Sequence, residues 1–143
     1  MTNVLRINKK IAPFNKKIFV DGDKSLSIRW VLLASQATGM SKAYNLLISE
    51  DVMAAIDSIK NLGIKVNIYK NYCEIYGNGI NGFKYKKNIV INAKNSGTLG
   101  RLILGLLVKS PQKIKLIGDK SLSKRDFSRI TMPLKKFGAK FFY

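Results

Sequence analysis

The chain has 143 residues, and its 26 lysine and arginine residues outnumber eight acidic ones, giving a formal net charge of +18. A hydrophobic fraction of 46% excludes a disordered chain, and no apolar run approaches the roughly 18 residues that a membrane span needs. One cysteine and no histidine exclude an internal disulfide, a zinc site built from those residues and any histidine-dependent nucleophile.

The positive charge does not by itself indicate a nucleic-acid partner. Most basic residues are lysines spread from end to end, and aromatic residues are not interleaved with arginine as in a base-stacking platform. We therefore expect no nucleic acid and no membrane as partner. The N-terminal stretch MTNVLRINKK carries charges where a signal peptide has its apolar segment, so we expect a cytoplasmic protein.

The first half of the chain predicts the order β-α-β-α-β-β. The expected elements are a strand at 16–20, a helix at 25–37, a strand at 42–48, a helix at 50–62 and a hairpin of strands at 64–69 and 72–77. Gly39 is expected to end the first helix, and Ser49 to cap the second. The expected apolar face of the first helix consists of Leu26, Trp30, Leu33, Ala34 and Ala37.

The pattern restarts after a polar loop at 77–87. The expected elements are a strand at 88–93, a helix from the loop at 94–98 to about residue 108, a strand at 113–118, a helix at 126–137 and a strand at 139–143. An offset of 75 residues sets Asp51 on Asp126 and Gly63 on Gly138. We therefore expect an α/β fold of repeated β-α-β-α-β-β units, with about two units present and the second incomplete.

This repeat predicts a division into an N-terminal segment at 1–15, a first unit at 16–87 and a truncated second unit at 88–143. The sequence ends at Tyr143, before the last strand expected in the second unit. Without that strand its neighbour would be an exposed apolar edge strand, and such an edge promotes aggregation. We expect the chain to be the front of a longer protein.

The hexapeptide GDKSLS occurs twice, at 22–27 and at 118–123, which are 96 residues apart. Because the repeat of the architecture has an offset of 75, the two copies are expected to occupy different places in their units. The first opens the first helix of its unit, and the second leads toward the second helix.

Cations and polar groups stand at three expected helix starts, at 23–25, 95–98 and 123–125. Helix N-termini carry unpaired N–H groups and a positive dipole, so a lysine or arginine there is explained best by an anion bound between them. Ser25 and Arg29 are four residues apart and share one helix face, and Thr98 and Arg101 repeat this arrangement three residues apart. The sequence GDKS is no P-loop, because the glycine spacing is wrong.

Three stretches together resemble the 5-enolpyruvylshikimate-3-phosphate (EPSP) synthase family. They are DGDKSLSIRW at the start of 21–66, NSGTLGRL at 95–102 and GDKSLSKRDF at the start of 118–139. The Lys24-Ser25 pair separates the chain from the sister UDP-N-acetylglucosamine enolpyruvyl transferases, which carry Lys-Asn there.

The resemblance implies transfer of the enolpyruvyl group of phosphoenolpyruvate to the 5-hydroxyl of shikimate 3-phosphate, with loss of phosphate and without a metal or cofactor. It also implies the inside-out α/β fold of this family and a monomeric parent enzyme. Lys24 and Arg125 are the implied catalytic residues, with Lys24 touching both substrates and Arg125 holding phosphoenolpyruvate. The implied substrate-binding residues are Lys24, Ser25, Arg29, Asn95, Gly97, Thr98 and Arg125.

The chain departs from the family pattern in two loops and leaves alternatives open. Lys94 stands where a glycine is usual before Asn-Ser-Gly-Thr, and Asp126 stands where proline is usual. The later acid and base residues and the second-domain cations have no counterpart here, so we expect the C-terminal portion of the same enzyme to be a required partner. The alternatives are a basic anion- or RNA-binding module on the same fold, as in RNA 3′-phosphate cyclase, and an inactive remnant.

Overall fold

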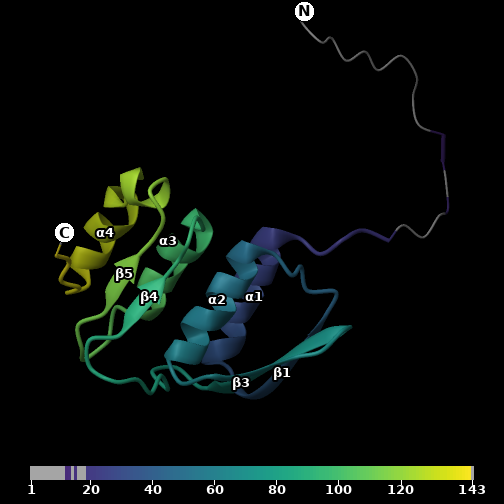
Figure 1. Cartoon of the computed structure of the whole chain (residues 1–143), viewed down its shortest axis with the longest axis horizontal. Helices are drawn as coiled ribbons and strands as arrows, with labels where there is room; N and C mark the ends of the chain where they lie inside the picture. Colours follow the sequence, from purple (N-terminus) through teal and green to yellow (C-terminus); the bar gives the residue numbers. More distant parts are fainter. Residues whose placement is uncertain (1–11, 14, 16–18, 143) are drawn as a thin grey trace, which may run out of the picture.

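The computed structural model describes residues 12, 13, 15 and 19–142, which form a mixed α/β fold (Figure 1). In chain order the elements are α1 (Lys24–Gln36), β1 (Thr38–Tyr44), α2 (Glu50–Asn61), β2 (Lys65–Ile68), β3 (Tyr72–Asn78), β4 (Val90–Asn92), α3 (Gly97–Leu106), β5 (Lys115–Ile117), the 3-10 helix η1 (Leu122–Lys124) and α4 (Ser128–Lys136). The α/β class is confirmed. Within the described part of the chain, none of the helices combines the length and the apolar character needed to cross a bilayer.

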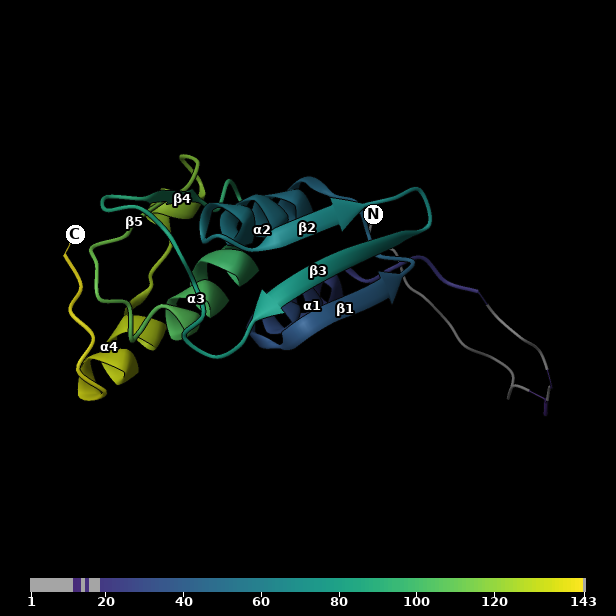
Figure 2. The same ribbon diagram turned by 90° about the horizontal axis from the view of Figure 1, so that it is seen from below.

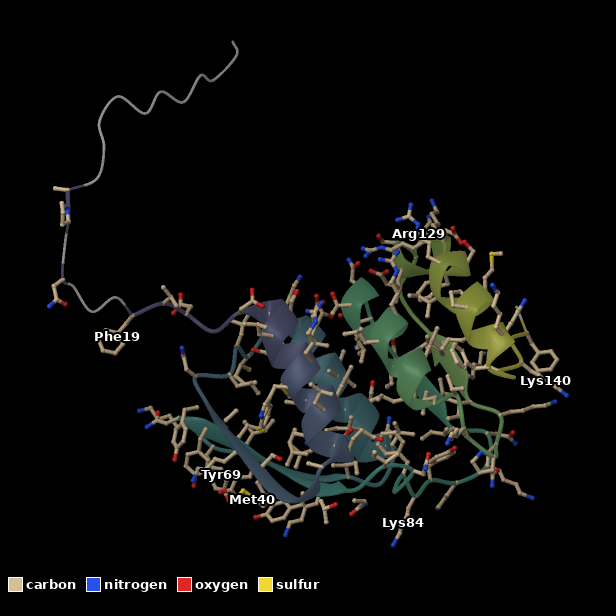
Figure 3. The ribbon with its side chains drawn as sticks, turned by 180° about the vertical axis from the view of Figure 1, so that it is seen from behind. Phe19, Met40, Tyr69, Lys84, Arg129 and Lys140 are labelled. Carbon is tan, nitrogen blue, oxygen red and sulfur yellow. The ribbon has the colours of Figure 1, made fainter. Side chains whose placement is uncertain are left out.

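Strands β1, β3 and β2 form an antiparallel sheet in that order, and α1 and α2 cover one of its faces (Figures 1 and 2). Met40 and Tyr69 lie on the opposite, open side of this sheet (Figure 3). The hairpin of β2 and β3 lies where the sequence predicts it. Side chains with no exposed surface fill the space between the elements, and they include Ile28, Val31, Val52, Ile56, Ile59, Ile75, Ile91, Leu99 and Ile103.

The strand predicted at 42–48 is wrong by four residues, because β1 already begins at Thr38. Helix α1 ends at Gln36, where Ala37 turns to an extended conformation, so Gly39 does not end the helix and is the second residue of the strand. Gly39 has a φ of 88° and lies opposite Gly77 of β3. The long pairing with β3 therefore sets the start of β1, and this pairing is a tertiary contact that the local sequence does not contain.

The predicted apolar face of α1 is only partly correct, since Ala34 is buried and Trp30 packs against the core, but the two leucines are not buried. Leu26 and Leu33 are 66% and 68% exposed, whereas the buried residues of this helix are Ser27, Ile28, Val31, Leu32, Ala34 and Ser35. Apolar side chains occur on almost every side of α1, so periodicity alone cannot select one face. The positions of β3, α2 and α3 decide which stripe is covered.

The second part of the chain holds the parallel pair of strands β4 and β5 with helices α3 and α4 (Figure 1). Both strands lie where the sequence predicts them, although each has only three residues. Residues 139–142 form no strand, contrary to the prediction, and Tyr143 lies outside the described residues. The first predicted strand and the segment at 1–15 also lie mostly outside them, and residues 19–20 are irregular.

The predicted offset of 75 is visible at the C-terminal ends of α2 and α4. Gly63 and Gly138 have φ values of 86° and 89°. The N–H of each glycine donates to a carbonyl three residues earlier, and the N–H of the residue after it donates to a carbonyl five residues earlier. Glycine is favoured at such helix ends because it lacks the Cβ that makes positive φ unfavourable. The division into units at residue 88 remains a prediction.

The two GDKSLS segments begin with the same turn and then diverge. Asp23 accepts a hydrogen bond from the N–H of Leu26 at 2.6 Å, and Asp119 accepts one from Leu122 at 2.7 Å. The first turn continues into the 13 residues of α1, whereas the second stops after the three residues of η1, between β5 and α4. The expectation of different places in the fold is confirmed, since identical residues share the local cap but have different tertiary surroundings.

Candidate active site

The first group of candidate residues lies at the N-terminal end of α1. Lys24 is the first residue of the helix, and the Asp23 side chain caps it. The Nη1 atom of Arg29 donates to the carbonyl oxygen of Ser25 at 3.0 Å, so the predicted proximity of these two residues is found. Lys24 and Arg29 are exposed and lie in the first turns of the helix, at the end that carries backbone N–H groups without helical partners.

The second group of candidate residues lies at the N-terminal end of α3. Ser96 is buried and caps this helix, because its Oγ accepts from the N–H of Leu99 at 3.3 Å. Arg125, thirty residues away in sequence, donates from Nη2 to the Oδ1 atom of Asn95 at 2.9 Å. A Cβ added at Gly97 would lie 2.5 Å from Nη1 of Arg125. The absence of a side chain at Gly97 therefore lets the guanidinium group approach the helix start closely.

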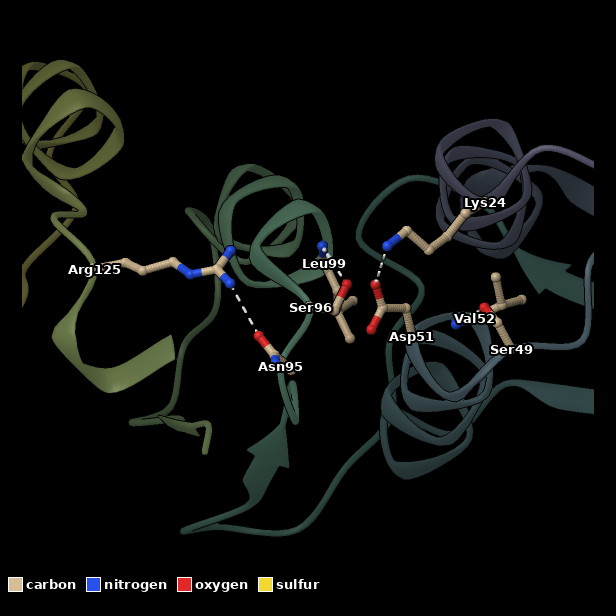
Figure 4. A network of polar contacts seen from close by, with 8 residues as sticks. All are labelled: Lys24, Ser49, Asp51, Val52, Asn95, Ser96, Leu99 and Arg125. Atoms are coloured by element: carbon tan, nitrogen blue, oxygen red, sulfur yellow. Dashed lines mark hydrogen bonds and ion pairs between the residues drawn. The ribbon is translucent and has the colours of Figure 1, made fainter. Parts of the chain in front are cut away.

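An ion pair joins the first group to α2. The ammonium of Lys24 lies 2.9 Å from Oδ2 of Asp51 in the first turn of α2, and Figure 4 shows this pair beside the ends of α1, α2 and α3. The sequence pattern aligns Asp51 with Asp126 and does not predict this contact. The contact depends on the packing of α1 against α2, which no local signal in the sequence indicates.

Other expected groups lie elsewhere or have different partners. The guanidinium carbon of Arg101 lies 5.9 Å from the ring centre of Phe127, so this side chain contacts the start of α4 in addition to sharing a helix with Thr98. Thr98 is half-buried in the first turn of α3. Lys120 and Lys124 are exposed in the segment around η1. Over the described ranges, no group of three or more cysteine or acidic side chains is placed to hold a metal ion.

This arrangement is suited to binding anions. Arg29 and Arg125 carry guanidinium groups, Lys24 lies in the same helix as Arg29, and two helix starts supply N–H donors and positive dipole ends. A guanidinium group can hold a phosphate or a carboxylate with two parallel hydrogen bonds. The site therefore matches a small ligand that carries several negative charges.

Lys94 adopts the left-handed conformation that glycine adopts freely, with a φ of 51°. Its N–H donates to Asn92 Oδ1 at 2.9 Å, and its carbonyl accepts from the N–H of Asp119 at 2.8 Å, so both sides of the residue are fixed. A residue with a Cβ loses roughly 1–2 kcal/mol in this conformation.

We predict that Lys94→Gly raises the free energy of unfolding by about 0.5–1 kcal/mol, after the larger chain entropy of glycine in the unfolded state is subtracted. Urea unfolding measures the change. Lys94→Ala is the matched control, since it removes the same charge but keeps the Cβ, and it should give no such gain. An equal gain in both variants would assign the effect to the charge.

Asp126, the second departure from the family pattern, precedes α4 and binds Ser128, the first residue of that helix. Its two carboxylate oxygens accept hydrogen bonds from the N–H of Ser128 at 2.7 Å and from its Oγ at 2.6 Å. These hydrogen bonds to Ser128 favour the ionised form and hold the pKa of Asp126 below its ordinary value of 3.8. Because the folded state lowers this pKa, the stabilisation is present above about pH 4 and is lost as the pH falls through the folded value.

We therefore predict that Asp126→Asn weakens the decrease of the unfolding free energy as the pH falls below about 4, while an asparagine oxygen still accepts the backbone hydrogen bond. Urea unfolding at a series of pH values measures the slope. Ser128→Ala, which removes one of the two donor groups, should change the slope in the same direction but less. Superimposable pH profiles of all three proteins would contradict the assignment.

Comparison with known proteins shows which family the chain resembles. A family model described as EPSP synthase (3-phosphoshikimate 1-carboxyvinyltransferase) matches residues 8–143. The 3-phosphoshikimate 1-carboxyvinyltransferases of Streptococcus pyogenes serotypes M2 and M1 are each 40% identical to the chain over 134 residues, which is 94% of this chain. The match covers 31% of those relatives, so the chain spans about a third of their length.

Solved structures give the same result for the fold. An EPSP synthase from Acinetobacter baumannii superposes with a TM-score of 0.77 at 35% sequence identity. The superposition covers 87% of this chain and 28% of that protein. A second structure of the enzyme from this organism gives a TM-score of 0.76.

Proposed function

The chain belongs to the EPSP synthase family, and from this premise we propose that it supplies one half of the active site of such an enzyme. The reaction is transfer of the enolpyruvyl group of phosphoenolpyruvate to the 5-hydroxyl of shikimate 3-phosphate. The hydroxyl loses its proton as its oxygen bonds to C2 of phosphoenolpyruvate, and C3 gains a proton to give a tetrahedral adduct. Phosphate then leaves from C2 while C3 loses a proton, which restores the double bond. The product is an intermediate on the route to chorismate and the aromatic amino acids.

The geometry supports different binding roles for the residues at the start of α1 and those at the start of α3. Lys24, Ser25 and Arg29 at the start of α1, with Thr98 of α3, would hold shikimate 3-phosphate. Arg125 would hold phosphoenolpyruvate, and Gly97 would leave room for it beside the helix start. Lys24 would contact both substrates and stabilise the charge that develops on the departing phosphate.

The observation that carries this proposal is the position of Arg125. It comes from the segment after η1, and its guanidinium group reaches Asn95 and the bare backbone of Gly97 at the start of α3. The dipole of α3 repels a cation at this end, and Asn95 offers the guanidinium group only a neutral acceptor, so an anion bound there explains its position better. The comparisons give no support to the alternative of a basic RNA-binding module.

The rest of the proposed enzyme would have to supply general acid and base groups. The acidic residues close to the candidate site are engaged locally, since Asp23 caps α1, Asp51 pairs with Lys24 and Asp126 binds Ser128. We propose that the C-terminal portion of the same enzyme brings these groups and further cations, in a monomeric cytoplasmic parent without metal or cofactor.

The test joins the 143-residue chain to the remaining two thirds of the Streptococcus pyogenes relative, a fusion that we call the completed enzyme. It should release phosphate only when both substrates are present, and the 143-residue chain alone should release none. Substrate-dependent release by the chain alone would contradict the proposed half-site. A folded fusion without activity would contradict the proposed function.

A further inference from the structure

The side chain of Lys24 is held in a position that its own helix does not favour. Lys24 is the first residue of α1, where the positive end of the helix dipole repels a cation. The flexible four-carbon side chain of a lysine would otherwise extend into water in many conformations. Its ammonium nevertheless lies 2.9 Å from the carboxylate of Asp51 (Figure 4).

Asp51 is the more fixed member of its ion pair with Lys24. The side chain of Asp51 is 19% exposed, whereas that of Lys24 is 53% exposed. The helices that carry them pack together through side chains with no exposed surface, such as Ile28 of α1 and Val52 of α2. The favourable end of the α2 dipole and the Ser49 cap hold the first turn of α2 in place.

We infer that Asp51 is a positioning residue that directs the ammonium of Lys24 toward the substrates. The inference rests on the proposed function, in which Lys24 contacts both anions. In the view of Figure 4, the Lys24–Asp51 pair lies on the side of Ser96 away from Arg125. The two cations would thus approach the start of α3 from opposite sides, each held by a partner, Asp51 or Asn95.

Asp51 has two opposing effects on a bound anion. It fixes the ammonium, which favours stabilisation of the transition state, and its negative charge repels the anionic substrates, which weakens their binding. Removal of the charge should therefore lower kcat without raising KM. A residue that only stabilised the fold would reduce the amount of active protein and would leave KM and the motion of Lys24 unchanged.

The first experiment compares four versions of the completed enzyme: wild type, Asp51→Asn, Asp51→Glu and the control Glu50→Gln. Glu50 is the exposed neighbour in the same helical turn, so its variant removes an equal charge close by. Asp51→Asn should lower kcat by about 10- to 100-fold with an equal or lower KM for shikimate 3-phosphate. Asp51→Glu should recover part of kcat, and Glu50→Gln should stay within about twofold of wild type.

The second experiment uses the 143-residue chain and needs no catalysis. NMR relaxation of the side-chain carbon and nitrogen nuclei of Lys24 should show restricted motion in the wild type and in Glu50→Gln, and greater motion in Asp51→Asn. If the completed enzyme is inactive, the proposed function fails, and this measurement alone decides whether Asp51 positions Lys24. An unchanged kcat in Asp51→Asn, a raised KM or unchanged motion of Lys24 would each overturn the inference.

Discussion

Lys24→Ala in the completed enzyme is expected to lower kcat by about 30- to 1,000-fold, which corresponds to roughly 2–4 kcal/mol. The ammonium stands at the start of α1, one turn from Arg29 and in contact with Asp51. Closure of the site around two anionic substrates would remove water from it. The loss of a charge-assisted contact there would therefore raise the activation free energy strongly. Steady-state kinetics with both substrates measures the effect.

Lys120→Ala is the matched control, because Lys120 has the same neighbours in the second GDKSLS segment. The two segments share the aspartate cap, but Lys120 lies in the turn before η1 and not at the start of a long helix. Its removal should change kcat by less than about tenfold, or roughly 1.4 kcal/mol. Equal damage in the two variants would show that the hexapeptides are functional equivalents and would refute the different places assigned to them.

Gly77→Ala is expected to lower the free energy of unfolding by roughly 3 kcal/mol, at the upper end of the range for an overpacked core. A Cβ at Gly77 would lie within the van der Waals radii of two backbone carbonyl oxygens, those of Ala34 and Ala37 at the end of α1. The oxygen of Ala37 also accepts a hydrogen bond from the N–H of Gly79 at 2.9 Å, so it cannot move away easily. Urea unfolding measures the loss.

Gly105→Ala provides the contrasting control. Gly105 lies inside α3, and a Cβ there would meet no atom within 4 Å. Because alanine has a higher helix propensity than glycine, this variant should be more stable by up to about 1 kcal/mol. Opposite signs for the two glycine substitutions would show that close approach of β3 to α1, and not the loss of glycine as such, governs the result. A neutral Gly77→Ala would contradict the packing assigned to this strand.

Local signals predicted several parts of the fold correctly. Ser49 caps α2, the hairpin of β2 and β3 lies at the predicted residues, and Gly63 and Gly138 end their helices at the predicted offset. Each of these features depends on contacts within a few residues, such as a side chain bound to an N–H three positions on. The start of β1 was predicted wrongly and the buried face of α1 only partly correctly, since both depend on the distant strand β3.

In the candidate site, too, some features follow from the local sequence and others only from the tertiary structure. The contact of Arg29 with Ser25 follows from helical spacing, and the positive φ of Lys94 falls where the family pattern has glycine. The resemblance supplied the identities of Asn95, Gly97 and Arg125, but not the contacts that join them.

The sequence alone determined the α/β class, the helix caps, the turn shared by the two GDKSLS segments and the kinds of charge at the helix starts, because short-range hydrogen bonds and spacing specify them. Only the tertiary structure decided that Lys24 pairs with Asp51 and that Arg125 reaches Asn95 across thirty residues. It also decided the lengths of the helices that follow the two hexapeptides, whose different places the 75-residue offset had predicted. The physical reason is that these contacts depend on how buried side chains bring separate helices together, and one segment of sequence does not encode that packing by itself.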